Sequence, residues 1–275
     1  MEAEEIHDIC YVRNAHKRQK LDLYFPASRS RPCPLIIYIH GGAFAFGTKK
    51  TELVPKHLRD HGYAVASLDY RLSGDAIFPA ALEDCKAAVR WLRAHAGRYQ
   101  IDGGRFVAWG ESAGGHQAVM LGVTGDTKEF DVGEHLDISS KVQGVVDYYA
   151  PTDFLQMDDH ALPGSLEHNA RESPESRYIG GPITENRALV EKANPITWIK
   201  RQLPPFFIAH GTEDRIVPLH QSELLVSALE KVGARAIFHP VDGAEHGFQG
   251  ATEEQTQALK EATEKFLKNL FDSLC

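Results

Sequence analysis

The 275-residue sequence predicts an α/β fold, in which a mostly parallel sheet carries helices on both faces. Short apolar runs alternate with longer amphipathic segments along most of the chain. The run 35–39 is apolar throughout, which is typical of a strand buried on both faces. A Gly-x-Ser-x-Gly sequence at 110–114 separates another apolar run from an Ala/Gly-rich segment, which predicts a strand, a very tight turn and a helix.

The N-terminal part of the chain predicts a hairpin, because Leu21, Leu23 and Phe25 alternate with polar residues as a half-buried strand does. Further along, 79–95 has an apolar helical stripe and Gly97 beyond its end. Taken in order, we expect strands at 9–13, 20–25, 35–39, 64–68, 106–109, 142–149, 205–209 and 236–241. We expect helices at 51–61, 79–95, 113–123, 220–232 and 255–274.

The alternation fails between about 152 and 199. This segment is rich in Pro, Gly, Asp, His and Arg, and irregular excursions of this length commonly cover a functional site. We find no repeat and no linker-like change of composition. The sequence therefore predicts one domain over 1–275, with a small cap-like insertion at about 152–199.

Composition excludes several classes of function. The net charge of −8 provides no basic surface for nucleic acid and disfavours anionic membranes. The acidic N-terminus is followed by no apolar signal region, and no run is long enough to span a bilayer. The cysteines are scattered, which indicates free thiols: Cys10, Cys33, Cys85 and Cys275. We expect a cytoplasmic protein unless a leader has been removed, and a homodimer stays open.

The sequence predicts no metal and no cofactor. It has 14 histidines, but no HExxH, no HxHxD and no Cys/His cluster with ligand spacing. No GxGxxG follows a strand, which disfavours dinucleotide binding.

Ser112, inside the Gly-x-Ser-x-Gly turn, is the candidate nucleophile, with a helix N-terminus directly behind it. A serine hydroxyl needs a base at neutral pH. His246 is in the loop after the last expected strand, and Asp214 is in the loop after the preceding one. The chain order of nucleophile, acid and base matches a known triad order, in which the carboxylate orients the imidazole.

A nucleophilic serine also requires donors for the oxyanion of the intermediate. The glycine loop that follows strand 35–39 supplies backbone N–H groups at Gly42 and Ala43, and Ala113 supplies another directly after the serine. These three residues are the expected oxyanion hole.

Five segments carry a resemblance to a known family: HGGAF (40–44), DYRL (69–72), GESAGG (110–115), HGTEDRIVP (210–218) and EHGF (245–248). In order and spacing the chain resembles α/β-hydrolase carboxylesterases of the hormone-sensitive-lipase-like and feruloyl/acetylxylan-esterase-like branches. The resemblance implies the α/β-hydrolase fold and a triad of Ser112, Asp214 and His246. Ala43 stands where the lipase-like group usually has a third glycine, which favours the HGGxW-type esterase and arylformamidase relatives.

The sequence favours a serine carboxylesterase that hydrolyses small short-chain or aromatic esters through an acyl-enzyme. An arylformamidase or a small-peptide amidase with the same triad is the alternative, and a non-catalytic ligand-binding homologue is a third. Other residues have plainer interpretations: Glu213 and Asp153 are weaker candidates for the acid, with Asp153 expected to be a turn or cap residue. His116, Trp91 and Trp109 are expected to pack, and Trp198 either packs or lines an acyl pocket.

Overall fold

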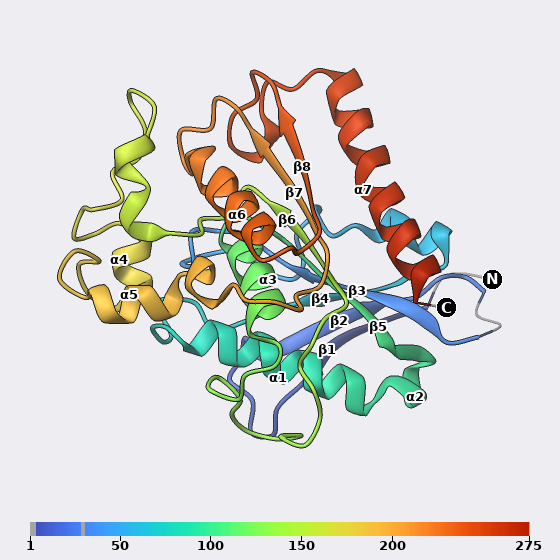
Figure 1. Ribbon diagram of the computed structural model, residues 1–275. Coiled ribbons are helices and arrows are strands. Elements are labelled where there is room, and N and C mark those ends of the chain that lie inside the picture. Colours follow the sequence, from blue (N-terminus) through green and yellow to red (C-terminus); the bar gives the residue numbers. More distant parts are fainter. Residues whose placement is uncertain (1–3, 29–30, 275) are drawn as a thin grey trace.

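The computed structural model describes residues 4–28 and 31–274, and within them eight strands form one sheet in the order β1-β2-β4-β3-β5-β6-β7-β8 (Figure 1). β1 and β2 pair antiparallel, as do β2 and β4, and all other pairs are parallel. The strands are β1 (Glu5–Cys10), β2 (Lys20–Tyr24), β3 (Cys33–Ile39), β4 (Ala64–Leu68), β5 (Ile101–Glu111), β6 (Gly144–Tyr148), β7 (Phe206–Gly211) and β8 (Ala236–Val241).

Helices cover both faces of the sheet, as the sequence predicts (Figure 1). Side chains of α1 (Ala80–Ala94), α2 (Ala96–Tyr99), α3 (Ala113–Thr124) and α6 (His220–Lys231) pack in one core with one face of the strands. On the other face, α7 (Glu253–Ser273) and the 3₁₀ helix η1 (Lys56–His61) pack in a second core. The α/β-hydrolase fold class is confirmed.

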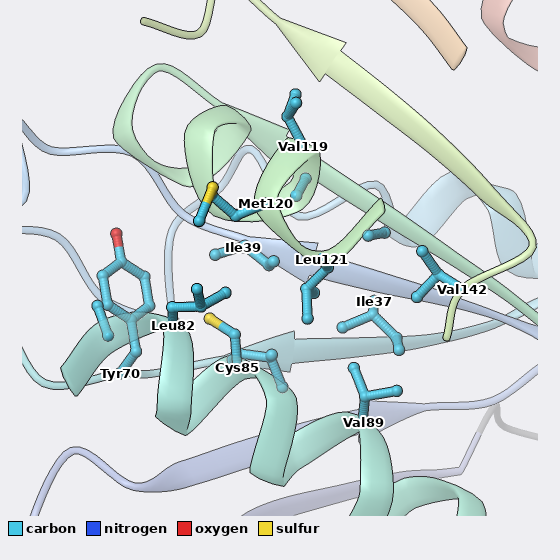
Figure 2. Close-up of a cluster of buried hydrophobic side chains, with 14 of the residues drawn as sticks. Ile37, Ile39, Tyr70, Leu82, Cys85, Val89, Val119, Met120, Leu121 and Val142 are labelled. Atoms are coloured by element: carbon cyan, nitrogen blue, oxygen red, sulfur yellow. The ribbon is translucent and has the colours of Figure 1, made fainter. Parts of the chain in front are cut away.

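The central strands hold the two cores apart. Ile37 of β3 lies opposite Ala66 of β4 and Ala108 of β5, and all three belong to the core beneath α1 and α3. Figure 2 shows Leu82 and Cys85 of α1 pointing toward Ile37, Ile39 and the side chains of α3. This packing fixes β3 and β5, and hence the two loops that follow their C-terminal ends.

Two of the expected elements differ in the structure. The expected helix at 51–61 is only η1, because Pro55 lacks an N–H and disfavours helical geometry in the residue before it; Gly62 ends η1 in the left-handed conformation (φ 83°). The expected first strand at 9–13 lies earlier, at Glu5–Cys10, and its pairing with β2 shifts between Ile6 and Ile9. The other expected strands and helices are present, with ends that differ by a few residues.

Residues 152–199 contain only short helices, and their chain lies beside α3 on the side away from α7 (Figure 1). They are η2 (Phe154–Gln156), η3 (Asp158–His160), α4 (Pro174–Ile179), α5 (Arg187–Ala193) and η4 (Pro195–Trp198). Phe154 and Tyr178 bury their rings against Phe44, which follows β3, so this segment is anchored to the loop at the site. Its role as a cap stays a prediction.

Cys10 and Cys85 are free thiols, exposed and buried respectively. Cys275 lies outside the described residues.

Candidate active site

Ser112 occupies a strained turn between β5 and α3. Its backbone lies at φ 53° and ψ −122°, and its N–H donates to the carbonyl of Tyr148 at 2.8 Å. A β-carbon at Gly110 would collide with the carbonyl of Gly114, and one at Gly114 would collide with the carbonyl of Ile39. Neither glycine position therefore admits a side chain, which fits the very tight turn predicted from the sequence.

The structure brings Ser112, His246 and Asp214 together. His246 Nδ1 lies 2.7 Å from Asp214 Oδ2, and its Nε2 lies 3.1 Å from Ser112 Oγ. Because a carboxylate can only accept, Nδ1 carries the hydrogen, and Nε2 of the neutral ring is left to accept from the serine hydroxyl. The imidazole is 23% exposed whereas the carboxylate is fully buried, so the pair faces the solvent only through the histidine.

Asp214 is held by more than one donor. The N–H groups of Ile216 and Val217 each donate to Oδ1 at 2.8 Å, and His210 Nε2 lies 3.2 Å from Oδ2. Burial by itself would raise the pKa of Asp214, but the imidazoles of His210 and His246 outweigh burial and hold this pKa well below its ordinary value. The carboxylate therefore stays ionised throughout the physiological range.

The two competing acids lie elsewhere. Glu213 is exposed and pairs with Arg215 at 3.7 Å. Asp153 caps η2, where its side chain accepts from the N–H of Leu155 at 3.2 Å, as expected for a cap residue. Neither carboxylate has a recorded contact with His246 in the described residues.

The loop after β3 lies across from the serine, with Gly42 at φ 117° and Ala43 at φ 50°. Within residues 4–28 and 31–274, the N–H groups of Gly42 and Ala43 meet no protein acceptor. Ala113 is the first residue of α3, so its N–H has no partner within the helix. Gly42 and Ala43 line one cavity together with Ser112, and Ala43 and Ala113 line a second that Ser112 also lines.

His40 anchors this loop. It is buried, and burial lowers the pKa of its ring to about 4, so the imidazole is neutral. Its Nδ1–H donates to Gly41 O at 2.7 Å, which leaves Nε2 to accept from Arg18 Nη2 at 3.5 Å. Arg18 also donates to Gly47 O at 2.7 Å, and Tyr70 stacks on the ring with centroids 4.6 Å apart. Arg18, just before β2, and Tyr70, in the DYRL segment, thus hold the loop after β3 in its conformation.

Glu111, next to the nucleophile, is buried and lines the same cavity as Ser112 and His246. Burial raises its pKa to about 7, although the Tyr149 hydroxyl, which donates to Oε2 at 3.3 Å, favours the ionised form. The ring of Tyr149 also contacts that of His246, with centroids 4.7 Å apart. Glu111 therefore changes charge close to neutral pH beside the imidazole.

Two cavities meet at Ser112. The larger, here called the main cavity, has a volume of about 500 Å³ and is lined by His246, Gly42, Glu111 and Tyr149 among others. The smaller, here called the small cavity, has about 40 Å³. Its walls come from the loop after β3, from the start of α3 and from the 152–199 segment, and include Phe44, Ala113, Leu166, His168 and Glu175. Ser112, Ala43 and Ile216 line both cavities, whereas His246 lines only the main one.

Several residues at the site were not identified from the sequence. In the sequence, His210 is only the first residue of the HGTEDRIVP segment, and Arg18 has no motif around it. The buried pair of His168 Nδ1 and Glu175 Oε2, 3.0 Å apart, closes the small cavity and has no sequence signal. His116 is buried against Phe154, as expected for a packing residue.

The three tryptophans have packing roles. Trp109 is buried, and Trp91 packs against the core, as expected. Trp198 contacts the ring of Phe130 and donates to Lys192 O at 2.9 Å, and it lines neither cavity.

In the described part of the chain, no group of three or more His, Cys, Asp or Glu side chains is placed to hold a metal ion. None of its helices combines the length and apolar character needed to cross a membrane.

Known proteins resemble this chain over most of its length. Esterase LipQ of Mycobacterium tuberculosis is 30% identical over 86% of this chain and 55% of its own length. The chain thus spans about half the length of the curated relatives it matches. The structure of a truncated carbohydrate esterase from gut microbiota is 29% identical, with a TM-score of 0.86 over 97% of this chain and 96% of that one. Thermogutta terrifontis esterase 2 is 26% identical, with a TM-score of 0.75 over 98% and 94%.

These likenesses agree with the resemblance drawn from the five sequence segments. The sequence profile of the BD-FAE family matches residues 21–229, which include Ser112 and Asp214. The chain belongs to the BD-FAE family and has the α/β-hydrolase fold.

Proposed function

We propose that this protein is a serine carboxylesterase that works through an acyl-enzyme. The observation that carries the proposal is the chain of contacts from Asp214 through His246 to Ser112, at 2.7 and 3.1 Å, in a turn that exposes the serine to a cavity. Ser112 Oγ attacks the ester carbonyl carbon while His246 Nε2 takes its proton, and the imidazolium then protonates the departing alkoxide. Water, activated by the same imidazole, releases the acid.

The N–H groups of Gly42, Ala43 and Ala113 would hold the oxyanion of both tetrahedral intermediates. Two observations support this role. Each of the three residues lines a cavity together with Ser112, and the N–H groups of Gly42 and Ala43 meet no protein acceptor among the described residues. Fixed backbone donors of this kind each contribute on the order of a hundredfold or more in rate.

The two cavities indicate how an ester substrate would be oriented at Ser112. The leaving alcohol must lie beside His246, which protonates it, and His246 lines only the main cavity. The acyl group then points into the small cavity. A water-sized group takes ~10–15 Å³ of cavity volume on this scale, so the small cavity of about 40 Å³ accepts about three or four non-hydrogen atoms. Acetyl and propionyl groups fit, whereas an aromatic acid does not.

The 152–199 segment supports the same assignment. Leu166, His168 and Glu175 form the outer wall of the small cavity, so the segment would act as a cap that sets the length of the acyl group. The relatives named as esterases, and the carbohydrate esterase among the structures, favour ester over amide substrates. A cytoplasmic location, a homodimer and the absence of nucleic-acid partners stay predictions from the sequence.

The test is a turnover panel with acyl chains from acetyl to laurate, methyl ferulate, acetylated sugars and N-formylkynurenine. Ser112→Ala provides the blank, and Ser227→Ala, an exposed serine on α6, is the matched control. We expect acetyl esters to be hydrolysed by the wild type and the control, and not by Ser112→Ala. Amide turnover in place of ester turnover would favour the formamidase alternative. Inertness toward a fluorophosphonate probe would remove the proposal altogether.

A further inference from the structure

We infer that the small cavity selects short acyl groups that carry a hydroxyl over alkyl groups of the same size, and that Glu175 recognises the hydroxyl. This inference rests on the proposed function, because it takes the small cavity as the acyl side of Ser112. Among the described residues that form its walls, the only polar side chains besides Ser112 are His168 and Glu175. A wall meant for alkyl groups alone would need neither.

Glu175 has one engaged and one free carboxylate oxygen. Its side chain is buried, and Oε2 lies 3.0 Å from His168 Nδ1. Within residues 4–28 and 31–274, no hydrogen bond or ion pair reaches Oε1. Oε1 nevertheless keeps accessible surface, whereas His168 Nε2, which also lacks a hydrogen-bond partner there, is sealed by protein atoms. Because Glu175 lines the small cavity, Oε1 is the atom of the pair that a bound acyl group can reach.

This free oxygen requires a hydrogen-bond donor. Burial by itself would lower the pKa of His168, but the hydrogen bond with Glu175 outweighs burial and raises this pKa above its ordinary value. The ring therefore donates from Nδ1, and Glu175 is the carboxylate that accepts and has no hydrogen of its own to give. An alkyl group packed against Oε1 would leave a buried acceptor unpaired, whereas a hydroxyl donates to it.

The pair also distinguishes a hydroxyl from an ammonium group. The protonated ring of His168 lies against the carboxylate of Glu175, with nitrogen and oxygen 3.0 Å apart, so the two charges largely cancel toward the cavity. An ammonium group would lose its hydration on entering and would gain little attraction in return. A hydroxyl loses much less hydration and makes the same hydrogen bond.

The position of Glu175 relative to the serine is fixed by packing. Glu175 lies in the first turn of α4, where the Ser173 side chain accepts from the N–H of Ser176 at 3.0 Å. Tyr178 of the same helix stacks on Phe44 with ring centroids 4.1 Å apart, and Phe44 directly follows the expected oxyanion donors. A recognition group held in this way discriminates between substrates better than a mobile one.

The test compares kcat/KM for 4-nitrophenyl esters in two pairs of matched size: hydroxyacetate with propionate, and methoxyacetate with butyrate. Both oxygen substituents activate the carbonyl, but only the hydroxyl can donate. The double variant His168→Leu, Glu175→Leu replaces the buried pair by apolar side chains, which cores often tolerate. We expect it to lower the hydroxyacetate-to-propionate ratio about tenfold, the effect of one hydrogen bond to a charged group, and to leave the methoxyacetate-to-butyrate ratio unchanged.

Glu175→Gln is the second variant. It keeps an oxygen for the Nδ1–H of His168 and presents an amide N–H in place of the free oxygen, so it should raise the methoxyacetate-to-butyrate ratio, because an ether oxygen accepts. Glu172→Gln is the matched control. Glu172 is an exposed carboxylate before α4 that pairs with Arg177 at 3.4 Å and lines neither cavity, so both ratios should stay as in the wild type.

Unchanged ratios in both variants would overturn the inference and leave the pair a purely structural role. Equal changes of the two ratios, or a glycine ester turned over faster than the hydroxyacetate, would overturn it as well. Failure of the proposed function is separate, because it would abolish acetate turnover already in the wild type. Thermal melts show whether each variant folds, and Glu175→Gln decides the question if the double variant does not.

Discussion

His210 Nε2 lies 3.2 Å from Asp214 Oδ2, the same oxygen that His246 contacts at 2.7 Å. His210 Nε2 is also 2.8 Å from the carbonyl of Val217, which can only accept, so this nitrogen carries a hydrogen. Its Nδ1 lies 2.7 Å from Ser222 Oγ. The carboxylate of Asp214 is thus positioned by a second imidazole that does not reach the nucleophile.

His210→Phe should lower kcat about tenfold with little change in KM, since it removes one charge-assisted contact from Asp214 and leaves the cavities intact. Kinetics on a short-chain acetate measure both constants. Ser222→Ala, which loses only the outer contact, is the milder control, and an unchanged kcat in His210→Phe would contradict a positioning role.

The backbone of Ala43 is strained, because it lies at φ 50°, in the left-handed region that favours glycine. Ala43→Gly should therefore raise the free energy of unfolding by up to ~1 kcal/mol, the relief of left-handed strain less the greater backbone entropy of glycine. Activity should be retained, since the N–H remains. The opposite change, Gly42→Ala, should abolish activity because a β-carbon would collide with the carbonyl of Phe46. Thermal melts and acetate turnover of both variants check these expectations. A less stable Ala43→Gly or an active Gly42→Ala would contradict them.

Asp147 gives a dependence of stability on pH. It is fully buried, and burial raises its pKa from 3.8 to about 8, although the N–H of Ala150 donates to Oδ1 at 3.1 Å. A carboxyl whose pKa is raised on folding stabilises the protein fully below pH 4, and this contribution is lost as the pH rises through about 8. Asp147→Asn should remove that slope and be more stable than the wild type at pH 8 by a few kcal/mol. Urea unfolding of the wild type and of Asp147→Asn at pH 5 and pH 8 measures this dependence. If the difference in free energy of unfolding between the two proteins were the same at both pH values, Asp147 would ionise freely.

Leu166 limits the acyl group at low cost to the fold, because it is 38% exposed yet lines the small cavity. Leu166→Ala should raise the ratio of hexanoate to acetate kcat/KM about tenfold, the lower end of what one methylene contributes to selectivity. Leu136→Ala, a similarly exposed leucine outside both cavities, should leave the ratio unchanged. An unchanged ratio in Leu166→Ala would place the acyl group elsewhere.

Much of the fold and the site could be predicted because the relevant signals are local. The turn around Ser112 needs glycine on both sides for steric reasons that appear as a five-residue pattern, and the continuous apolar runs mark the central strands. Asp214 and His246 follow consecutive parallel strands, so their chain order alone predicts that they lie at the same edge of the sheet.

What could not be predicted depends on contacts between distant segments. His168 and Glu175 form a buried pair that closes the small cavity, but in the sequence each is one polar residue among many in an irregular stretch. The expected helix at 51–61 was wrong, because Pro55 interrupts it and only the short helix η1 forms after the proline. The cavity of about 350 Å³ between α7 and the ends of β5 and β6 likewise depends on distant segments meeting, which no local pattern describes.

Arg18 lies outside the stretch 21–229 that the family profile matches, yet it donates to the carbonyls of both Gly47 and Tyr70. A fragment trimmed to the matched stretch would lose this clamp at one end and His246 with all of α7 at the other. On the proposed mechanism, the shortest competent piece would extend past β8, which keeps His246, and would begin before β2, which keeps Arg18. Boundaries drawn from the profile match alone would omit the proposed base.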